Sequence, residues 1–229
     1  MLTEEMINEL QKYKKYWWKE DEETEYKEIK KEPFHLLIFT VLSQNTSSQN
    51  TRKAYIGLKK KFQISPHELM EADEKVLSEA IKAGGLHKIK ARRIIDISKY
   101  IVENWNGKLD WLFKKSKEEA RKELLKLPGI GNKTADVIIS SIHGYKEAFV
   151  VDTHMRRIAI RMGLVDENAE YEEIQKKLSN IFPWKKIKGR EEEILGLFWL
   201  LAKYTCNAIK PRCKECVLAS ICNRANNKR

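Results

Sequence analysis

The sequence predicts an all-α protein, and three observations support this class. Apolar residues recur at helical spacing along most of the 229 residues. Serine, aspartate and proline residues precede these stripes and can start helices, and glycines follow several of them. The apolar run 148–151 is short, and no longer alternating pattern suggests a strand. We therefore expect about ten to twelve helices.

The first half of the chain contains five helix starts. They lie at Pro33, Ser47 or Ser48, Ser65-Pro66, Asp73 and the segment after Gly84-Gly85. Proline fits the first turn of a helix, and serine and aspartate side chains accept hydrogen bonds from its unpaired N–H groups. The last of these helices carries isoleucines at helical spacing, and Asn106-Gly107 ends it.

The second half of the chain continues the helical pattern. Ser116 and Glu119 form a capping box for a helix that runs to Leu127. A glycine turn follows, and then a helix that His143-Gly144 interrupts. Asp152 caps the next helix, which ends at Gly163, and two further helices cover about 171–181 and 191–204.

The net charge of +11, from 44 basic and 33 acidic residues, indicates a polyanionic partner. Nucleic acid is the first candidate for a chain of this charge, although a lysine-rich surface can also serve solubility or heat stability. The charged start 1–5 does not resemble a signal peptide, and no run of eighteen apolar residues occurs. We expect a cytoplasmic protein with no membrane partner.

The segment 127–135, Leu-Pro-Gly-Ile-Gly-Asn-Lys-Thr-Ala, places two glycines in a tight turn between two predicted helices. Glycine allows close backbone approach, and the start of a helix offers unpaired N–H groups to a phosphate. Lys133 follows in the first turn of the second helix. Its amine could be a phosphate contact or a nucleophile, and the residues alone leave both open.

All four cysteines fall in one segment with the spacing C-x6-C-x2-C-x5-C: Cys206, Cys213, Cys216 and Cys222. Four thiolates suit a structural zinc ion or a [4Fe–4S] cluster. Zinc ribbons usually carry two C-x2-C pairs, whereas this segment has one, so the spacing favours the cluster. The cations Lys210, Arg212 and Lys214 lie between the cysteines and could offset thiolate charge or bind phosphates.

Taken together, these motifs resemble the endonuclease III-type DNA glycosylases of the helix-hairpin-helix superfamily. The glycine turn with Lys133, the downstream sequence Val151-Asp152-Thr153-His154 and the cysteine loop carry the resemblance. Their order and separations are close to those of the family. The similarity extends from about Pro33 to Cys222, which is nearly the whole chain.

The resemblance implies a two-domain fold. Residues 32–145 would form a six-helix barrel domain that holds the hairpin. Residues 1–31 and 146–229 would form the [4Fe–4S] cluster domain, with the cluster held by the four cysteines. Double-stranded DNA would lie across a basic cleft with its damaged base flipped out, because a stacked base cannot be reached inside a duplex. We expect a monomer in the cytoplasm, associated with the nucleoid.

The resemblance also implies catalytic roles for two residues. Lys133 stands where bifunctional members have the lysine that attacks C1′ of the sugar and forms a Schiff base. Asp152 would take up a proton or stabilise positive charge that develops on the sugar. The ordinary alternatives are a solvated helix lysine and a simple N-cap.

Further contacts with DNA are expected from several short segments. Gly129, Ile130 and Gly131 would hold a phosphate through their backbone N–H groups. Gln44 or Asn45 would fill the gap left by the flipped base, and Leu86 with His87 would wedge into the opposite strand. The tryptophans, Trp199 among them, are expected to fill the core or the region between the domains.

The expected function is base excision repair of damaged, most often oxidised, pyrimidines, with strand cleavage at the abasic site by β-elimination. A glycosylase of the same fold for mismatched, deaminated or alkylated bases stays open, as does a DNA-binding module without catalysis. A glycosylase for adenine opposite damaged guanine is disfavoured, because no carboxylate lies at 38–41, where those enzymes have one.

Overall fold

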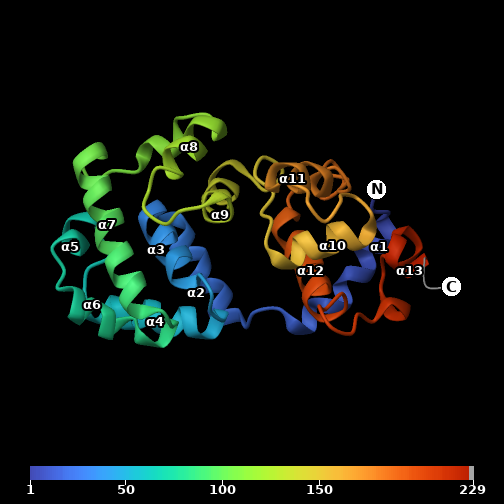
Figure 1. Cartoon of the computed structure of the whole chain (residues 1–229), viewed down its shortest axis with the longest axis horizontal. Helices are drawn as coiled ribbons and strands as arrows, with labels where there is room; N and C mark the ends of the chain where they lie inside the picture. Colours follow the sequence, from blue (N-terminus) through green and yellow to red (C-terminus); the bar gives the residue numbers. More distant parts are fainter. Residues whose placement is uncertain (227–229) are drawn as a thin grey trace. The chain divides into compact units, whose positions relative to one another are not determined.

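The computed structural model describes residues 1–226, and all regular structure in that part of the chain is helical (Figure 1). The α-helices are α1 (Glu4–Glu9), α2 (Glu20–Lys31), α3 (Pro33–Ser43), α4 (Ser48–Lys61), α5 (Pro66–Met70), α6 (Glu74–Ala80), α7 (His87–Trp105), α8 (Lys117–Leu124), α9 (Asn132–His143), α10 (Thr153–Met162), α11 (Tyr171–Ser179), α12 (Glu191–Tyr204) and α13 (Asn223–Asn226). Short 3₁₀ helices cover η1 (Leu10–Tyr16), η2 (Lys82–Gly84), η3 (Asp110–Phe113), η4 (Cys213–Glu215) and η5 (Ala219–Ile221). The predicted all-α class is confirmed.

The chain divides into two compact units. The central unit is Glu20–His143, and the terminal unit combines Met1–Lys19 with the segment from Gly144 onward. The sequence-based division at 32 and 145 differs mainly in α2, which belongs to the central unit. Arg52 on α4 explains this placement, because it donates to Asp21 at 3.0 Å and to Glu25 at 2.5 Å, both on α2.

The helix starts of the central unit follow the predicted capping chemistry. Ser47, Ser65 and Asp73 each accept a hydrogen bond from a backbone N–H in the first turn of the helix that follows. Ser116 and Glu119 form the reciprocal capping box of α8. Each such cap satisfies N–H groups that the helix itself leaves unpaired, and it contributes about 1 kcal/mol.

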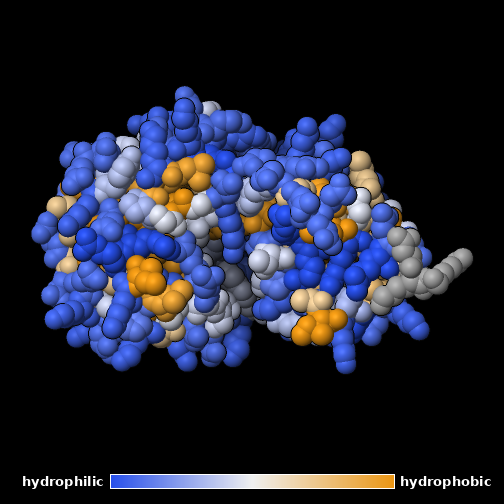
Figure 2. All heavy atoms as spheres, viewed as in Figure 1, coloured by the Kyte–Doolittle hydropathy of each residue, from blue (hydrophilic) through white to orange (hydrophobic). Residues whose placement is uncertain are grey.

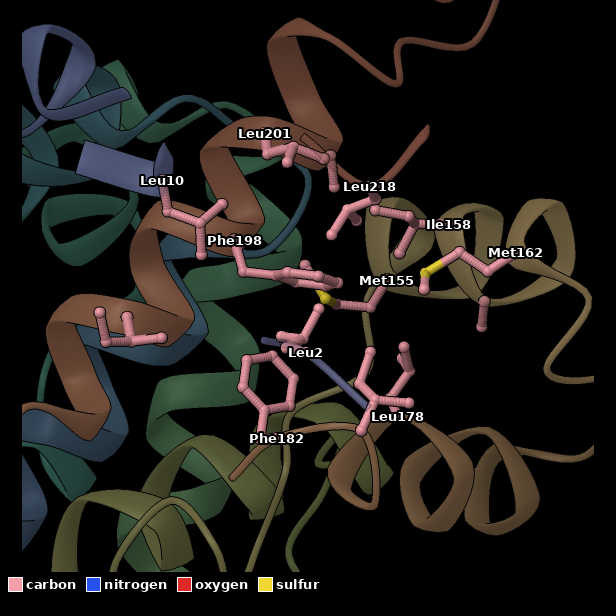
Figure 3. Packing of buried hydrophobic residues seen from close by; sticks show 14 of the residues in the cluster. Leu2, Leu10, Met155, Ile158, Met162, Leu178, Phe182, Phe198, Leu201 and Leu218 are labelled. Carbon is pink, nitrogen blue, oxygen red and sulfur yellow. The ribbon is translucent and has the colours of Figure 1, made fainter. Parts of the chain in front are cut away.

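The terminal unit has a hydrophobic core formed by segments far apart in the sequence (Figure 3). Side chains from the N-terminus, α10, α11 and α12 meet there: Leu2, Leu10, Met155, Ile158, Leu178, Phe182, Phe198 and Leu201. The backbone N–H of Leu2 donates to the carbonyl of Ile181 at 2.8 Å. The hydroxyl groups of Tyr13 and Thr205 share a 2.7 Å hydrogen bond. The N-terminal segment is thus an integral part of the unit that carries the cysteines.

The surface is mainly hydrophilic, with separate apolar patches, on the face seen in Figure 2. Large apolar side chains that stand exposed include Leu86, Ile89 and Ile209. None of the helices in the described part of the chain combines the length and the apolar character that a membrane span requires.

Candidate functional site

The turn between α8 and α9 has the geometry that its glycines suggested. Gly129 has φ +69°, a left-handed conformation that strains other residues, and Ile130 anchors the turn by burying its side chain. A Cβ at Gly129 would lie 2.1 Å from Nε of Arg93 on α7, so this side chain packs directly against the turn. Gly131 has open space around its Cα, and its carbonyl accepts from the N–H of Ala135 at 3.0 Å.

Lys133 lies in the first turn of α9 with its side chain exposed. The three residues that follow it are buried and Asn132 before it is half-buried, so Lys133 is the most exposed side chain of this turn. Buried Asp136 accepts a 2.8 Å hydrogen bond from Arg121 on α8, and this ion pair ties the two helices of the hairpin together. The fold therefore presents the Lys133 amine at the start of α9, and the ion pair with α8 fixes the position of that helix.

Gln44, directly after α3, bonds to the hairpin. Its Nε2 donates to the carbonyl of Gly129 and to the hydroxyl of Thr134, each at 3.3 Å. Its Oε1 accepts a short hydrogen bond from Arg93. Asn45 beside it is exposed and has φ +53°, so it lies outside this network. Of the two predicted gap-filling residues, Gln44 is the one that the structure places against the glycine turn.

The predicted wedge segment lies between η2 and α7. Leu86 is 52% exposed, so it is not a core residue, and its φ of +49° turns the chain sharply. His87 shares a 2.7 Å hydrogen bond with Ser78 of α6 and is thereby fixed in place. Lys90 is almost fully buried and donates to the carbonyls of Leu42 and Gly84, at 2.8 and 2.9 Å.

Asp152 caps α10 in the terminal unit, and its carboxylate accepts three hydrogen bonds. Oδ1 accepts from the backbone N–H groups of His154 and Met155, at 2.9 and 2.8 Å. Oδ2 accepts from Nε1 of Trp199 on α12 at 2.7 Å. Trp199, expected from the sequence to fill the core or the region between the domains, thus contacts the candidate catalytic carboxylate. No sequence signal marked this contact, because it joins two helices far apart along the chain.

The cysteine loop follows α12. Burial, with a smaller contribution from the nearby Cys206, Cys213 and Cys222, raises the pKa of the Cys216 thiol to about 11. The four thiols therefore share one neighbourhood. In residues 1–226, no three His, Cys, Asp or Glu side chains are arranged to hold a metal ion.

Arg161 on α10 anchors the cysteine loop. Its guanidinium donates to the carbonyls of Cys206, Asn207 and Ala208 at 3.0, 2.6 and 2.8 Å, and to Sγ of Cys206 at 3.4 Å. No sequence pattern marks this arginine, because α10 lies beside the loop only in the folded chain.

The three cations of the loop differ in their surroundings. Lys210 and Lys214 are exposed. Arg212 donates to the carbonyl of Tyr204 at 2.9 Å and pairs with Glu215 at 3.7 Å, so part of its donor capacity stabilises the loop itself. The lysines are thus better placed than Arg212 to bind an external anion.

The predicted site residues divide between the two units. Gln44, the glycine turn and the residue after Lys133 come together in the central unit, with Leu86 in the same unit. Asp152, Trp199 and the cysteine loop belong to the terminal unit.

Comparisons with known proteins agree with these features. The family model for HhH-GPD superfamily base excision DNA repair proteins matches residues 38–183. Endonuclease III of Thermotoga maritima is 38% identical over 196 residues, which cover 83% of each chain. Endonuclease III of Bacillus subtilis is 30% identical over 86% of this chain and 83% of its own.

Solved structures show the same relationship. A trapped covalent intermediate of endonuclease III with DNA superimposes with a TM-score of 0.71 and 27% identity, covering 100% of this chain and 99% of that one. The chain thus resembles these proteins over nearly its full length, and it contains the helical hairpin, the N-cap aspartate Asp152 and the four-cysteine loop. The chain belongs to the HhH-GPD superfamily of base excision DNA repair proteins and is of the endonuclease III type.

Proposed function

We propose that this protein removes a damaged base from duplex DNA and then cleaves the strand, with Lys133 as the nucleophile. The observation that carries the proposal is the exposed Lys133 amine at the start of α9, two residues after Gly131, which has open space around it. The relative trapped as a covalent intermediate with DNA supports a nucleophilic mechanism for the type.

In the proposed reaction, neutral Nζ of Lys133 attacks C1′ of the flipped nucleotide. The bond from C1′ to the base breaks, and the base leaves with the bonding electrons and takes up a proton. Loss of the amine proton and opening of the sugar ring give a Schiff base between Nζ and C1′. Removal of a proton from C2′ then expels the 3′ phosphate oxygen, and water releases the lysine.

Asp152 is proposed to act on the sugar during these steps. A carboxylate near C1′ can stabilise the positive charge that develops as the base departs, and it can take up the amine proton. Two backbone donors and Trp199 fix the orientation of the carboxylate in the terminal unit. Such fixed orientation favours catalysis because little reorganisation is needed during the reaction.

The remaining site residues are proposed to hold distorted DNA. The N–H groups of Gly129 and Gly131 would bind a phosphate at the start of α9. The N–H of Ile130, expected from the sequence to join them, instead donates to the carbonyl of Leu127 at 3.1 Å and closes the turn. Gln44 would fill the gap left by the flipped base, and Leu86 and His87 would enter the opposite strand. The 52% exposure of Leu86 leaves its side chain accessible to an opposing DNA strand, as the wedge requires.

The four cysteines are proposed to hold a [4Fe–4S] cluster. Their common neighbourhood fits ligation of one metal group by all four sulfur atoms. Burial raises the pKa of the Cys216 thiol, so a bound cationic iron group would be needed to stabilise its thiolate. Ligation by the four cysteines would fix the conformation of the loop that carries Lys210, Arg212 and Lys214, so that these cations could bind DNA phosphates. A brown protein with absorption near roughly 400 nm supports the cluster, and a colourless anaerobic preparation supports zinc.

Oxidised pyrimidines are the proposed substrates, and the protein would act as a monomer in the cytoplasm, where the DNA lies. Glycosylases of the fold act on other lesions too: a thermostable thymine-DNA glycosylase shares it, with a TM-score of 0.69 at 22% identity. A panel of duplexes, each with one oxidised, mismatched or alkylated base, decides among these substrates.

Borohydride reduction tests the proposed nucleophile. It should trap the wild-type protein on abasic DNA as a covalent complex, and Lys133→Gln should abolish the complex. Lys122→Gln is the matched control, since Lys122 is an exposed lysine on α8 of the same hairpin. Absence of trapping by the wild-type protein would refute the lyase activity, and trapping by Lys133→Gln would assign it to another amine.

A further inference from the structure

Arg93 connects two parts of the central unit that the proposed function assigns to DNA, the side chain of Gln44 and the glycine turn. It lies on α7, seven residues after Leu86 in the sequence. Its guanidinium donates to Gln44 and packs against Cα of Gly129. In the described part of the chain no carboxylate lies within ion-pair distance of Arg93, whereas its neighbour Arg92 pairs with Glu74 and Asp96 at 3.3 and 3.2 Å.

The hydrogen bonds around Gln44 fix the orientation of its side-chain amide. Arginine has only donors, so Arg93 must face the oxygen Oε1. The amide nitrogen therefore points toward the Gly129 carbonyl and the Thr134 hydroxyl, both of which can accept. Without Arg93 no charged donor would hold Oε1, and the amide could rotate or leave the hairpin.

A shallow hollow of about 510 Å³ adjoins this network and is lined by residues of α7 and the hairpin turn. Its lining carries three cations, Lys88, Arg92 and Arg93, against one carboxylate, Asp96, and Pro128 and Gly129 form its other wall. Arg93 is thus half-buried between Gln44 and a basic surface that faces solvent. A duplex phosphate in this hollow would be attracted by all three cations, and only Arg93 also bonds to Gln44.

We infer that Arg93 is a positioning residue that holds Gln44 against the hairpin, so that the gap-filling side chain and the phosphate-binding turn engage damaged DNA together. This inference rests on the proposed gap-filling role of Gln44. It predicts that Arg93 contributes to the preference for DNA with a gap in its base stack, and not only to the general attraction of DNA. Arg92 contributes only the general attraction, because its guanidinium bonds to acidic side chains.

The test compares binding to an undamaged duplex with binding to the same duplex carrying a tetrahydrofuran abasic analogue, which the protein cannot cleave. Arg92→Ala removes the same charge and should weaken binding to both duplexes by a similar factor. Arg93→Ala should reduce the preference for the abasic duplex by about tenfold, as expected for loss of a charge-assisted hydrogen bond. Gln44→Ala should reduce the preference comparably.

The double variant Arg93→Ala/Gln44→Ala distinguishes a joint action from two separate ones. If Arg93 acts through Gln44, the double variant prefers the abasic duplex as much as the single variant with the smaller preference does. Additive losses, or an Arg93→Ala variant that behaves like Arg92→Ala, would overturn the inference. If the wild-type protein shows no preference for the abasic duplex, the proposed gap-filling function itself fails, and this result is visible before any variant is compared.

Discussion

The bond from Trp199 to Asp152 allows a quantitative prediction. Replacing Trp199 by Phe keeps an aromatic ring beside His154, whose ring lies 5.3 Å away, and removes only the Nε1 donor. Asp152 would keep its two backbone donors but lose the donor on Oδ2. A hydrogen bond to a charged group contributes about 1.5 to 3 kcal/mol. If the whole contribution is felt in the transition state, base excision slows by about 10- to 100-fold.

Single-turnover excision of the preferred lesion measures this effect, because excess enzyme separates chemistry from product release. Trp184→Phe is the control: its Nε1 donates to the Ser179 carbonyl at 2.9 Å in the same unit, and Asp152 is not its partner. We expect Trp184→Phe to excise at nearly the wild-type rate. In a background of Asp152→Asn, Trp199→Phe should have little further effect. A Trp199→Phe rate within about twofold of wild type would refute the positioning role.

Three further predictions concern the stability of the central unit. Gly129→Ala should lower the free energy of unfolding by about 1 kcal/mol, because alanine is strained at φ +69°. Gly131→Ala should leave the free energy of unfolding unchanged and weaken only DNA binding. Urea denaturation measures the stability of each variant, and a binding titration measures its affinity for DNA. Arg121→Ala leaves buried Asp136 without its 2.8 Å ion-pair partner and should destabilise the unit by about 3 kcal/mol in the same urea assay. Tyr55→Phe should make stability less sensitive to alkaline pH, since burial raises the pKa of Tyr55 to about 12, and unfolding at several pH values measures this.

The sign of the pH effect follows from proton linkage. The folded pKa of Tyr55 lies above its ordinary value of 10.0, so its stabilising contribution is complete below about pH 10 and is lost as the pH rises toward 12. At about pH 11 the loss is about 1 kcal/mol, which Tyr55→Phe cannot show because it has no proton to release. Equal slopes for the two proteins would contradict the assignment. A Gly131→Ala variant as unstable as Gly129→Ala, or an Arg121→Ala variant as stable as wild type, would contradict the other two predictions.

Local features of the sequence predicted much of this fold. The caps at Ser65, Asp73 and Ser116 depend on residues within one helical turn, so their patterns identify helix starts directly. Helix α2 was not predicted, because it is almost wholly polar and carries no clear apolar stripe. The short helix α13 has no buried residue that would have marked it.

The candidate site was predictable only in part, for a related reason. Motifs located Lys133, Asp152 and the cysteines, since each lies in a characteristic local sequence. The partners Trp199 and Arg93 lie on other helices, and they reach Asp152 and Gln44 only through tertiary packing. A side chain that supports another has no spacing rule along the chain, so sequence patterns do not identify it.

Lys90 shows how such tertiary contacts organise the two segments that are proposed to distort DNA. Its ammonium group donates to the carbonyl of Leu42, two residues before Gln44, and to that of Gly84, two residues before Leu86. Lys90 is almost fully buried, so water does not reach the group that holds the two carbonyls. This burial lowers the pKa of Lys90, and the positive charge of Arg93 lowers it further. Because both carbonyls would be left unsatisfied without this side chain, Lys90 fixes the segment of Gln44 relative to the segment of Leu86. The proposed gap-filling and wedge roles both need this fixed spacing, because the two side chains would have to enter one DNA site together.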